Sequence, residues 1–267
     1  MFGGNQFWWV GLMMMAIFIS MNIIVFALRN HPRISYRVAY FIAFYLLLNK
    51  VAEYIAYQAL GEHLRLPVEF SALSYFAFAI FVVFRFGKAD SFPAFCAVLT
   101  GLIFTISFWV SPDSFILDMD HPFLFINSVL NHHLVYLGGM LMLANARKYS
   151  WKQCWQPALG VGIFVGYSWL FHSLSAYSSI YGKPIIIQIC DASILAWLFK
   201  DMQISPGVYV AYYLLVVALL VGLFVGFYAL NRWGVRYRSR RGIDEDGYCL
   251  HWKEVFCAKK SQKVEEK

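Results

Sequence analysis

Charged residues are scarce in this chain. Only 14% of its 267 residues are Asp, Glu, Lys or Arg, whereas soluble domains carry about 25%. So little charge cannot cover the surface of an ordinary water-soluble protein, and the mean hydropathy of +0.58 indicates the same. The shortage therefore excludes a typical soluble domain and predicts a membrane protein.

Paired cysteines and metal-binding motifs are also lacking. The five cysteines are scattered without a Cys-x-x-Cys pair, so neither a disulfide framework nor a zinc site is indicated. The histidines lack the spacings of catalytic zinc sites, and no metal or other cofactor is expected. The last apolar run has no lysine for a Schiff base, which argues against a retinal-binding photoreceptor.

What the chain does have is long, continuous apolar runs. Each run has about the length, ~20 residues, that a helix needs to cross the hydrocarbon core. None shows the alternation of apolar and polar residues that is typical of a membrane β-barrel. The predicted fold class is therefore all-α, a bundle of seven transmembrane helices over residues 1–241 followed by a fraying tail, 242–267. The predicted spans are Phe7–Leu28, Tyr36–Leu60, Leu66–Phe86, Phe92–Val110, Pro122–Ala146, Pro157–Ile180 and Gly207–Leu230.

Lysine and arginine are distributed unevenly between the two sides. Eighteen of the 22 lie after the first, third, fifth and seventh runs. The positive-inside rule then predicts that the N-terminus is outside and the tail cytoplasmic, in the inner or plasma membrane of the cell. The basic cluster after Leu230 is typical of an anchor beside anionic lipid, so the expected partners are membrane lipids and not nucleic acid.

Two further patterns concern packing and connections. Glycines four residues apart, at Gly162/Gly166 and Gly222/Gly226, are typical of closely packed helix faces and not of a ligand site. The connection Tyr181–Pro206 is partly apolar but too short to cross the membrane and return. We expect it to lie in the outer interface or to re-enter.

Ionisable side chains also occur in the buried part of the predicted spans, and these all fall between the midplane and the outer face. Lys50 and Glu53 are one helical turn apart, and Tyr57 continues the same face. Other polar residues at similar depth are Glu69, Ser71, Asn131, His132, His172 and Ser173. A central charge costs about 2.5–3.5 kcal/mol on insertion scales. We therefore expect these groups to share one polar cavity that opens outward.

Simpler interpretations stay open for single residues. Lys50 could extend toward the outer headgroups, with Glu53 only neutralising it. A lone buried serine usually bonds its own helix, and a lone histidine is more often a packing residue. Adjacent His132 and His133 point about 100° apart, so at most one should face a given site. The shared depth of the whole set favours the common cavity.

Two stretches carry a family resemblance. "LPVEFSALSYFAFAIFVVF" (Leu66–Phe84) and "LNHHLVYLGGMLML" (Leu130–Leu143) resemble the YwaF-type integral membrane family, and "SAYSSIYGKPIIIQI" is similar to the stretch leading to that family's last outer Lys-Pro pair. Relatives of the family include transmembrane phospholipid acyltransferases and, more distantly, androgen-induced lipid hydrolases. The resemblance covers roughly residues 49–213.

The resemblance implies lipid acyl chemistry in the outer half of the bilayer. Ser71 takes the place of the family's cysteine and His132 that of its histidine, while Asn131 replaces a serine and Glu69 a common histidine. Ser71 would be the nucleophile and His132 the base, with Glu69 or Glu53 orienting the imidazole.

The expected substrate-binding set surrounds these catalytic candidates. Lys50, Asn131 or His172 would stabilise the oxyanion or hold a phosphate. Ser173 and Tyr57 complete the set.

Two other functions remain open. Lys50, Glu53, Glu69 and His172 could form an ion or proton relay in a transporter or channel component, although the inner half lacks ionisable groups. Alternatively, the replacement of cysteine by Ser71 and of histidine by Glu69 is what a non-catalytic, lipid-binding member of the family would show.

Overall fold

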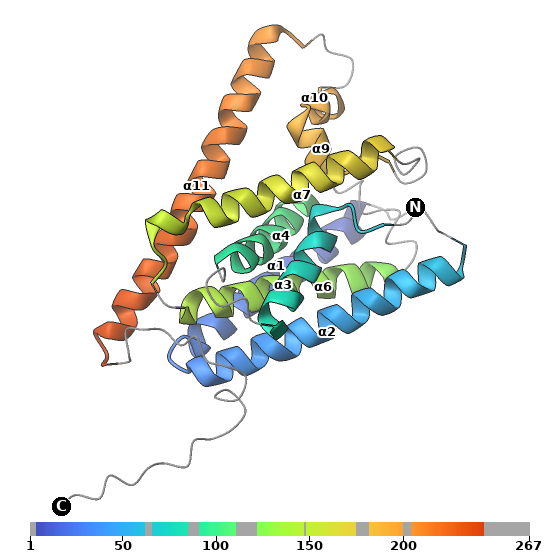
Figure 1. Cartoon of the computed structure of the whole chain (residues 1–267). Coiled ribbons are helices and arrows are strands. Elements are labelled where there is room, and N and C mark those ends of the chain that lie inside the picture. Colours follow the sequence, from blue (N-terminus) through green and yellow to red (C-terminus); the bar gives the residue numbers. More distant parts are fainter. Residues whose placement is uncertain are drawn as a thin grey trace, which may run out of the picture.

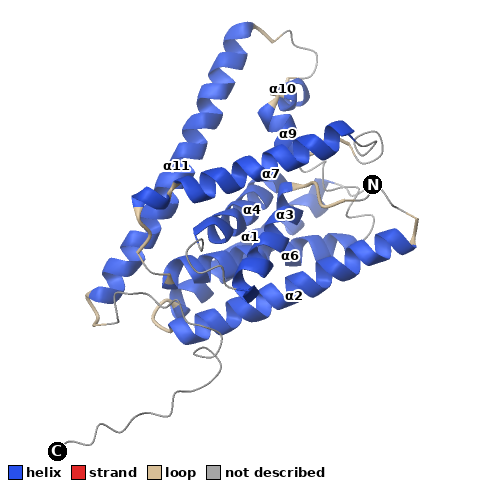
Figure 2. Cartoon of the chain, in the orientation of Figure 1, coloured by secondary structure: helices blue, strands red, loops and turns tan. Residues whose placement is uncertain are grey.

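The computed structural model describes residues 4–61, 66–84, 91–110, 122–146, 148–174, 182–199 and 204–242. Within these ranges all the regular structure is helical, as Figure 2 shows, so the all-α prediction is confirmed. The helices are α1 (Gly4–Leu28), α2 (Pro32–Ala59), α3 (Phe70–Phe84), α4 (Ser91–Val110), α6 (Pro122–Asn145), the 3-10 helix η2 (Trp151–Gln153), α7 (Trp155–Leu174), α9 (Ile185–Cys190), α10 (Ser193–Leu198) and α11 (Pro206–Ser239). Of the predicted tail, only Gly242 lies within the described residues.

Several of these helices have the length and composition of membrane spans. Among the described residues, four are long and apolar enough to cross a membrane: Trp8–Leu28, Pro32–Ala59, Ser91–Phe108 and Pro206–Ser239. The apolar helix α3 is shorter, with 15 residues. Each predicted span overlaps one of α1, α2, α3, α4, α6, α7 and α11. The structure thus fits an integral membrane protein.

Proline begins and glycine ends two of the long helices. Pro32 opens α2 and Pro206 opens α11, where a missing N–H costs nothing. After the last residues of these helices, Gly61 and Gly242 adopt positive φ angles of 82° and 68°, the left-handed conformation that commonly terminates a helix. Residue type therefore sets where both helices stop.

Helix α6 lies at the centre of the bundle. Helices α4, α2, α1, α11 and α3 all pack against it (Figure 1), and the contact with α4 is the most extensive. Glycine permits this approach: a Cβ added at Gly101 of α4 would lie 2.3 Å from the Cβ of Tyr136, and one at Gly139 of α6 would lie 2.8 Å from the Cβ of Ala97. Residues on α6 are consequently held firmly by their neighbours.

Helix α11 packs against the other long helices through its C-terminal part. Its buried residues begin at Phe227, and Figure 1 shows its N-terminal half leaning away from the other long helices. The close packing predicted at Gly162/Gly166 and Gly222/Gly226 is not found within the chain, because no described atom lies within 4 Å of a Cβ added at any of the four. Each of these four glycines therefore faces open space in the described part of the chain.

Replacing Gly101 by alanine should destabilise the protein, because the Cβ of Tyr136 belongs to a helix that would have to shift. Such overpacking costs about 1–3 kcal/mol. Gly162→Ala is the matched control, since its site is open and alanine favours helix by about 1 kcal/mol. Thermal unfolding of the purified variants measures both; equal melting temperatures would contradict the packing described for α4 and α6.

Candidate functional site

Lys50 and Glu53 form an ion pair inside the bundle. Lys50 Nζ lies 2.6 Å from Glu53 Oε2, and the Tyr57 hydroxyl donates to Glu53 Oε1 at 3.1 Å. Lys50 is only 8% exposed, and its ammonium lies 4.9 Å above the ring of Tyr75 on α3. The two side chains therefore pair as the helical spacing predicts, and the Lys50 ammonium is buried between α2 and α3.

Three asparagines connect this pair to α6. Asn49 Nδ2 donates to the side-chain oxygens of Asn127 and Asn131, at 3.0 Å each, and Asn127 Nδ2 donates to Glu53 Oε2 at 3.4 Å. The sequence interpretation overlooked Asn49 and Asn127. The four-residue spacing of Asn127 and Asn131, which puts both on one face of α6, was a usable signal. We call these residues, with Lys50, Glu53 and Tyr57, the polar network.

A cavity of about 300 Å³ lies beside the polar network, between α3, α4, α6 and α9. Three of the four predicted catalytic residues line it: Glu69, Ser71 and His132. The fourth, Glu53, lies in the polar network, and so do the expected substrate-binding residues Lys50, Tyr57 and Asn131. The cavity walls also contain hydroxyls and apolar side chains that the sequence interpretation did not select: Phe70, Thr100, Ile103, Phe104, Ser107, Ser128, Ile185, Ile186 and Ile189.

The ring of His132 is fixed on three sides. Its Nδ1 lies 2.7 Å from the Ser128 carbonyl, its face stacks on Phe104 with centroids 3.8 Å apart, and its edge meets Tyr75 at 5.4 Å. A carbonyl can only accept, so in the neutral ring Nδ1 carries the proton and Nε2 is the free acceptor. Nε2 has no hydrogen-bond partner within the described ranges.

The carboxylates have partners other than His132. Glu53 binds Lys50, Tyr57 and Asn127, and Glu69 lies beside the backbone N–H of Ile185, where α9 begins. The sequence predicted that Glu69 or Glu53 would orient the imidazole of His132. In the structure the Ser128 carbonyl has this role instead. Among the described residues, no hydrogen bond joins Ser71 to His132, although both line the cavity.

One cavity hydroxyl is buried without a partner. Thr100 is 3% exposed, and its Oγ1 makes no hydrogen bond to any described residue. A buried hydroxyl usually bonds the carbonyl one turn earlier on its own helix, as Thr105 does to Gly101 at 2.9 Å. Thr100 therefore offers the cavity a donor that the fold does not use.

Helix α7 does not bring its predicted residues to the cavity. His172 is half-buried and Ser173 exposed, and neither lines the wall. The contribution of α7 is instead Ser168, whose hydroxyl donates to the Val68 carbonyl at 2.6 Å and holds the chain just before Glu69. Only one of the adjacent histidines faces the cavity, as expected: His133 bonds the Val129 carbonyl at 2.7 Å and is absent from the lining.

The segment around α9 covers one side of the cavity and is fastened at both ends. Lys183 pairs with Asp191, whose Oδ1 accepts from the Ser193 amide at 3.0 Å. Burial alone would raise the pKa of Asp191, but the hydrogen bonds from Lys183 and Ser193 lower it below its ordinary value. On α11, the Tyr212 hydroxyl donates to the Ile189 carbonyl at 2.8 Å. These contacts hold the isoleucines of α9 against the cavity.

The geometry does not favour a metal centre. Within the described ranges, no group of three His, Cys, Asp or Glu side chains is arranged to hold an ion.

Comparison with family models, curated proteins and solved structures gives no match to this chain. Function therefore has to be inferred from the cavity and the polar network themselves.

Glu53→Gln should destabilise the protein strongly, because it leaves the Lys50 ammonium buried without a carboxylate. Removing one member of a buried pair costs about 3–5 kcal/mol. The double variant Lys50→Met/Glu53→Gln should recover much of this loss. Thermal unfolding in lipid nanodiscs measures the effect; a single variant as stable as the wild type would show that Lys50 finds another partner.

Proposed function

We propose that this chain is a seven-span membrane protein that carries out serine-dependent acyl chemistry on a membrane lipid, as an acyltransferase or acyl hydrolase. The observation that carries the proposal is that Ser71 and His132 line the same cavity, with apolar side chains facing them. The resemblance of Leu66–Phe84 and Leu130–Leu143 to the YwaF-type family supports the same class of reaction.

The apolar wall suits a lipid substrate. Ile103, Ile185 and Ile189 offer an acyl chain a surface without polar groups, while Ser71, Thr100, Ser107, Ser128 and His132 supply polar groups to the same cavity. Ligand sites commonly combine such an apolar lining with a few placed polar groups. An ester with its carbonyl at Ser71 and its chain along the isoleucines would satisfy both parts of the cavity.

The proposed reaction proceeds in two steps. The Ser71 hydroxyl attacks the ester carbonyl and passes its proton to His132 Nε2; the bond to the alcohol part of the lipid then breaks, and that leaving oxygen takes the proton from His132. The acyl group, now on Ser71, passes to water or to a second lipid hydroxyl, which His132 deprotonates. The bond between the acyl carbon and the Ser71 oxygen then breaks, and that oxygen takes the proton back from His132. The unused hydroxyl of Thr100 is suited to donate to the oxyanion.

The hydroxyl and the imidazole must approach each other for this reaction. Catalytic hydrogen bonds are often long in the free enzyme and tighten when substrate binds. His132 is already oriented, because Phe104 and the Ser128 carbonyl restrain its ring. We therefore expect the smaller Ser71 side chain, which turns about a single bond, to move more than the imidazole when substrate binds.

Ser71→Ala and His132→Gln should each lower acyl release by about a hundredfold or more, because each removes a group from the reacting set. The assay is fatty-acid release from labelled phospholipid by purified protein in nanodiscs, with intact-mass detection of an acyl adduct on Ser71. Two neighbouring residues serve as controls. Ser74→Ala removes a hydroxyl that bonds the Phe70 carbonyl, and His133→Gln removes an imidazole that does not line the cavity. Full activity in both Ser71→Ala and His132→Gln would refute the proposal.

We also propose an orientation with the N-terminus and α9 outside and the basic end of α11 in the cytoplasm. Cys154 and Cys190 are both exposed, whereas Cys96 is buried. In a Cys249→Ser/Cys257→Ser background, a membrane-impermeant maleimide should label Cys190 in intact cells and Cys154 only after permeabilisation. The reverse order would invert the orientation.

The polar network supports a second candidate, an ion or proton relay. Asn131, Asn49, Asn127, Glu53 and Lys50 form one continuous chain of hydrogen bonds between α2 and α6. Ion flux into proteoliposomes that requires Glu53 and survives Ser71→Ala would favour the relay over acyl chemistry.

A further inference from the structure

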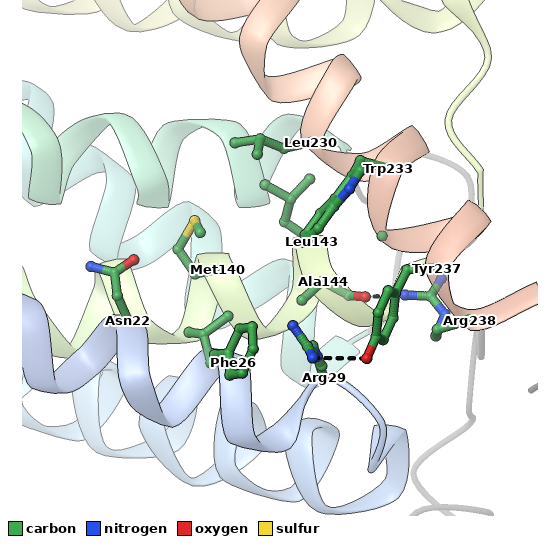
Figure 3. A pocket seen from close by; sticks show the side chains of 12 residues that line it. Asn22, Phe26, Arg29, Met140, Leu143, Ala144, Leu230, Trp233, Tyr237 and Arg238 are labelled. Carbon is green, nitrogen blue, oxygen red and sulfur yellow. Dashed lines mark hydrogen bonds between the residues drawn. The ribbon is translucent and has the colours of Figure 1, made fainter. Parts of the chain in front are cut away.

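A second cavity, of about 290 Å³, lies at the opposite end of α6, where α1, α6 and α11 meet (Figure 3). Most of its wall is apolar, formed by Val25, Phe26, Met140, Leu143, Leu230 and Trp233. Two arginines, Arg29 and Arg238, line one end of it, with Tyr237 between them in the view of Figure 3. We call it the inner cavity. It shares no lining residue with the cavity of Ser71 and His132.

Arg29 is held in place by aromatic rings. Its guanidinium carbon lies 3.4 Å from the ring centre of Phe26 and 4.3 Å from that of Tyr237, and Nη2 donates to the Tyr237 hydroxyl at 2.8 Å. A guanidinium has five N–H donors, so most of its capacity remains. Stacking of this kind fixes the planar group for recognition of a phosphate or carboxylate.

Arg238 is 2% exposed and adds a second positive charge. Its Nη1 and Nη2 donate to the carbonyls of Ala144 and Ala146, the latter at 2.6 Å, which caps the C-terminal end of α6. Its Nε makes no hydrogen bond to any described residue. A buried N–H that points at no partner is costly, and an anionic acceptor would satisfy it.

No carboxylate accompanies these two arginines in the described part of the chain. Its acidic residues are Glu53, Glu69 and Asp191, which belong to the polar network, the first cavity and the α9 segment. Buried charges in proteins are normally paired. The inner cavity thus combines an apolar wall with two guanidinium groups that need an anion.

We propose that the inner cavity binds an anionic phospholipid, with its phosphate at Arg29 and Arg238 and part of one acyl chain against Met140, Leu143 and Trp233. At about 290 Å³ the cavity is at the lower end of ligand-site volumes. It therefore accommodates part of one chain and not a whole lipid, and the rest remains in the bilayer.

Neighbouring charge favours a lipid as the source of the phosphate. On another face of α11, Arg232, Arg236 and Arg240 line a separate pocket together with Lys148. Basic side chains next to a membrane attract anionic lipid by about 1 kcal/mol each. Under the proposed orientation this is the cytoplasmic leaflet. The bound lipid joins α1 to α11 through the two arginines.

The test compares purified full-length protein in detergent with phosphatidylglycerol, phosphatidylcholine or inorganic phosphate. Native mass spectrometry and thermal unfolding should show a bound phosphatidylglycerol that raises the melting temperature, and neither other probe should do so. Arg29→Gln should weaken phosphatidylglycerol binding about tenfold or more, because it removes charge-assisted hydrogen bonds. Arg33→Gln is the matched control: Arg33 is exposed on α2 and does not line the cavity.

Three results would overturn the proposal. Equal losses in Arg29→Gln and Arg33→Gln would assign binding to general surface charge. Stabilisation by inorganic phosphate alone would identify a free-anion site. If phosphatidylglycerol binds only after Asp244, Glu245 and Asp246 are changed to amides, the chain's own acidic segment is the occupant.

A second variant tests the apolar part of the cavity. Met140→Trp fills that part and keeps both arginines, and it should abolish phosphatidylglycerol binding.

Discussion

A buried ion pair needs polar neighbours as well as its own two charges, and in this chain α6 supplies some of them to the Lys50–Glu53 pair of α2. Lys50 holds Glu53, Glu53 accepts from Asn127, and Asn49 joins Asn127 to Asn131. Sliding α2 past α6 by a single turn would keep Lys50 beside Glu53 but would separate Asn49 and Glu53 from Asn127 and Asn131 inside an apolar bundle. Because α6 is the helix on which the others pack, this register also fixes the direction in which His132 faces.

Hydrophobicity and spacing predicted much of this arrangement. The apolar runs marked the long helices, and one helical turn between Lys50 and Glu53 predicted their pairing. Asn49 and Thr100 were missed because their role depends on the register between helices, which no local pattern specifies, whereas the spacing of Asn127 from Asn131 was a local signal that was overlooked. His172 was instead selected wrongly. The sequence indicates how deep it lies along α7, but not the direction in which its side chain points around the helix axis. The place of α9 likewise depends on tertiary contacts of a six-residue helix.

The two cavities are different chemical environments at the two ends of one helix. The first presents hydroxyls and an imidazole from α3, α4 and α6, whereas the inner cavity presents one guanidinium group from the residue that follows α1 and one from α11. His132 and Ala144 are ~18 Å apart at the usual helical rise. Between them, Gly138 and Gly139 let Phe78 and Ala97 approach closely, so this part of α6 is held tightly on two sides. A displacement of α6 at the inner cavity would therefore be transmitted along the helix to the cavity of Ser71 and His132.

The cap on α6 has a consequence for biosynthesis. Arg238, which donates to the carbonyls of Ala144 and Ala146, is 94 residues further along the chain than the first of them. A ribosome that delivers helices in order has inserted α6 well before it reaches Arg238. Until translation passes that codon, the last turn of the central helix keeps its carbonyls bonded to water. Completion of the bundle is thus coupled to synthesis of its final helix.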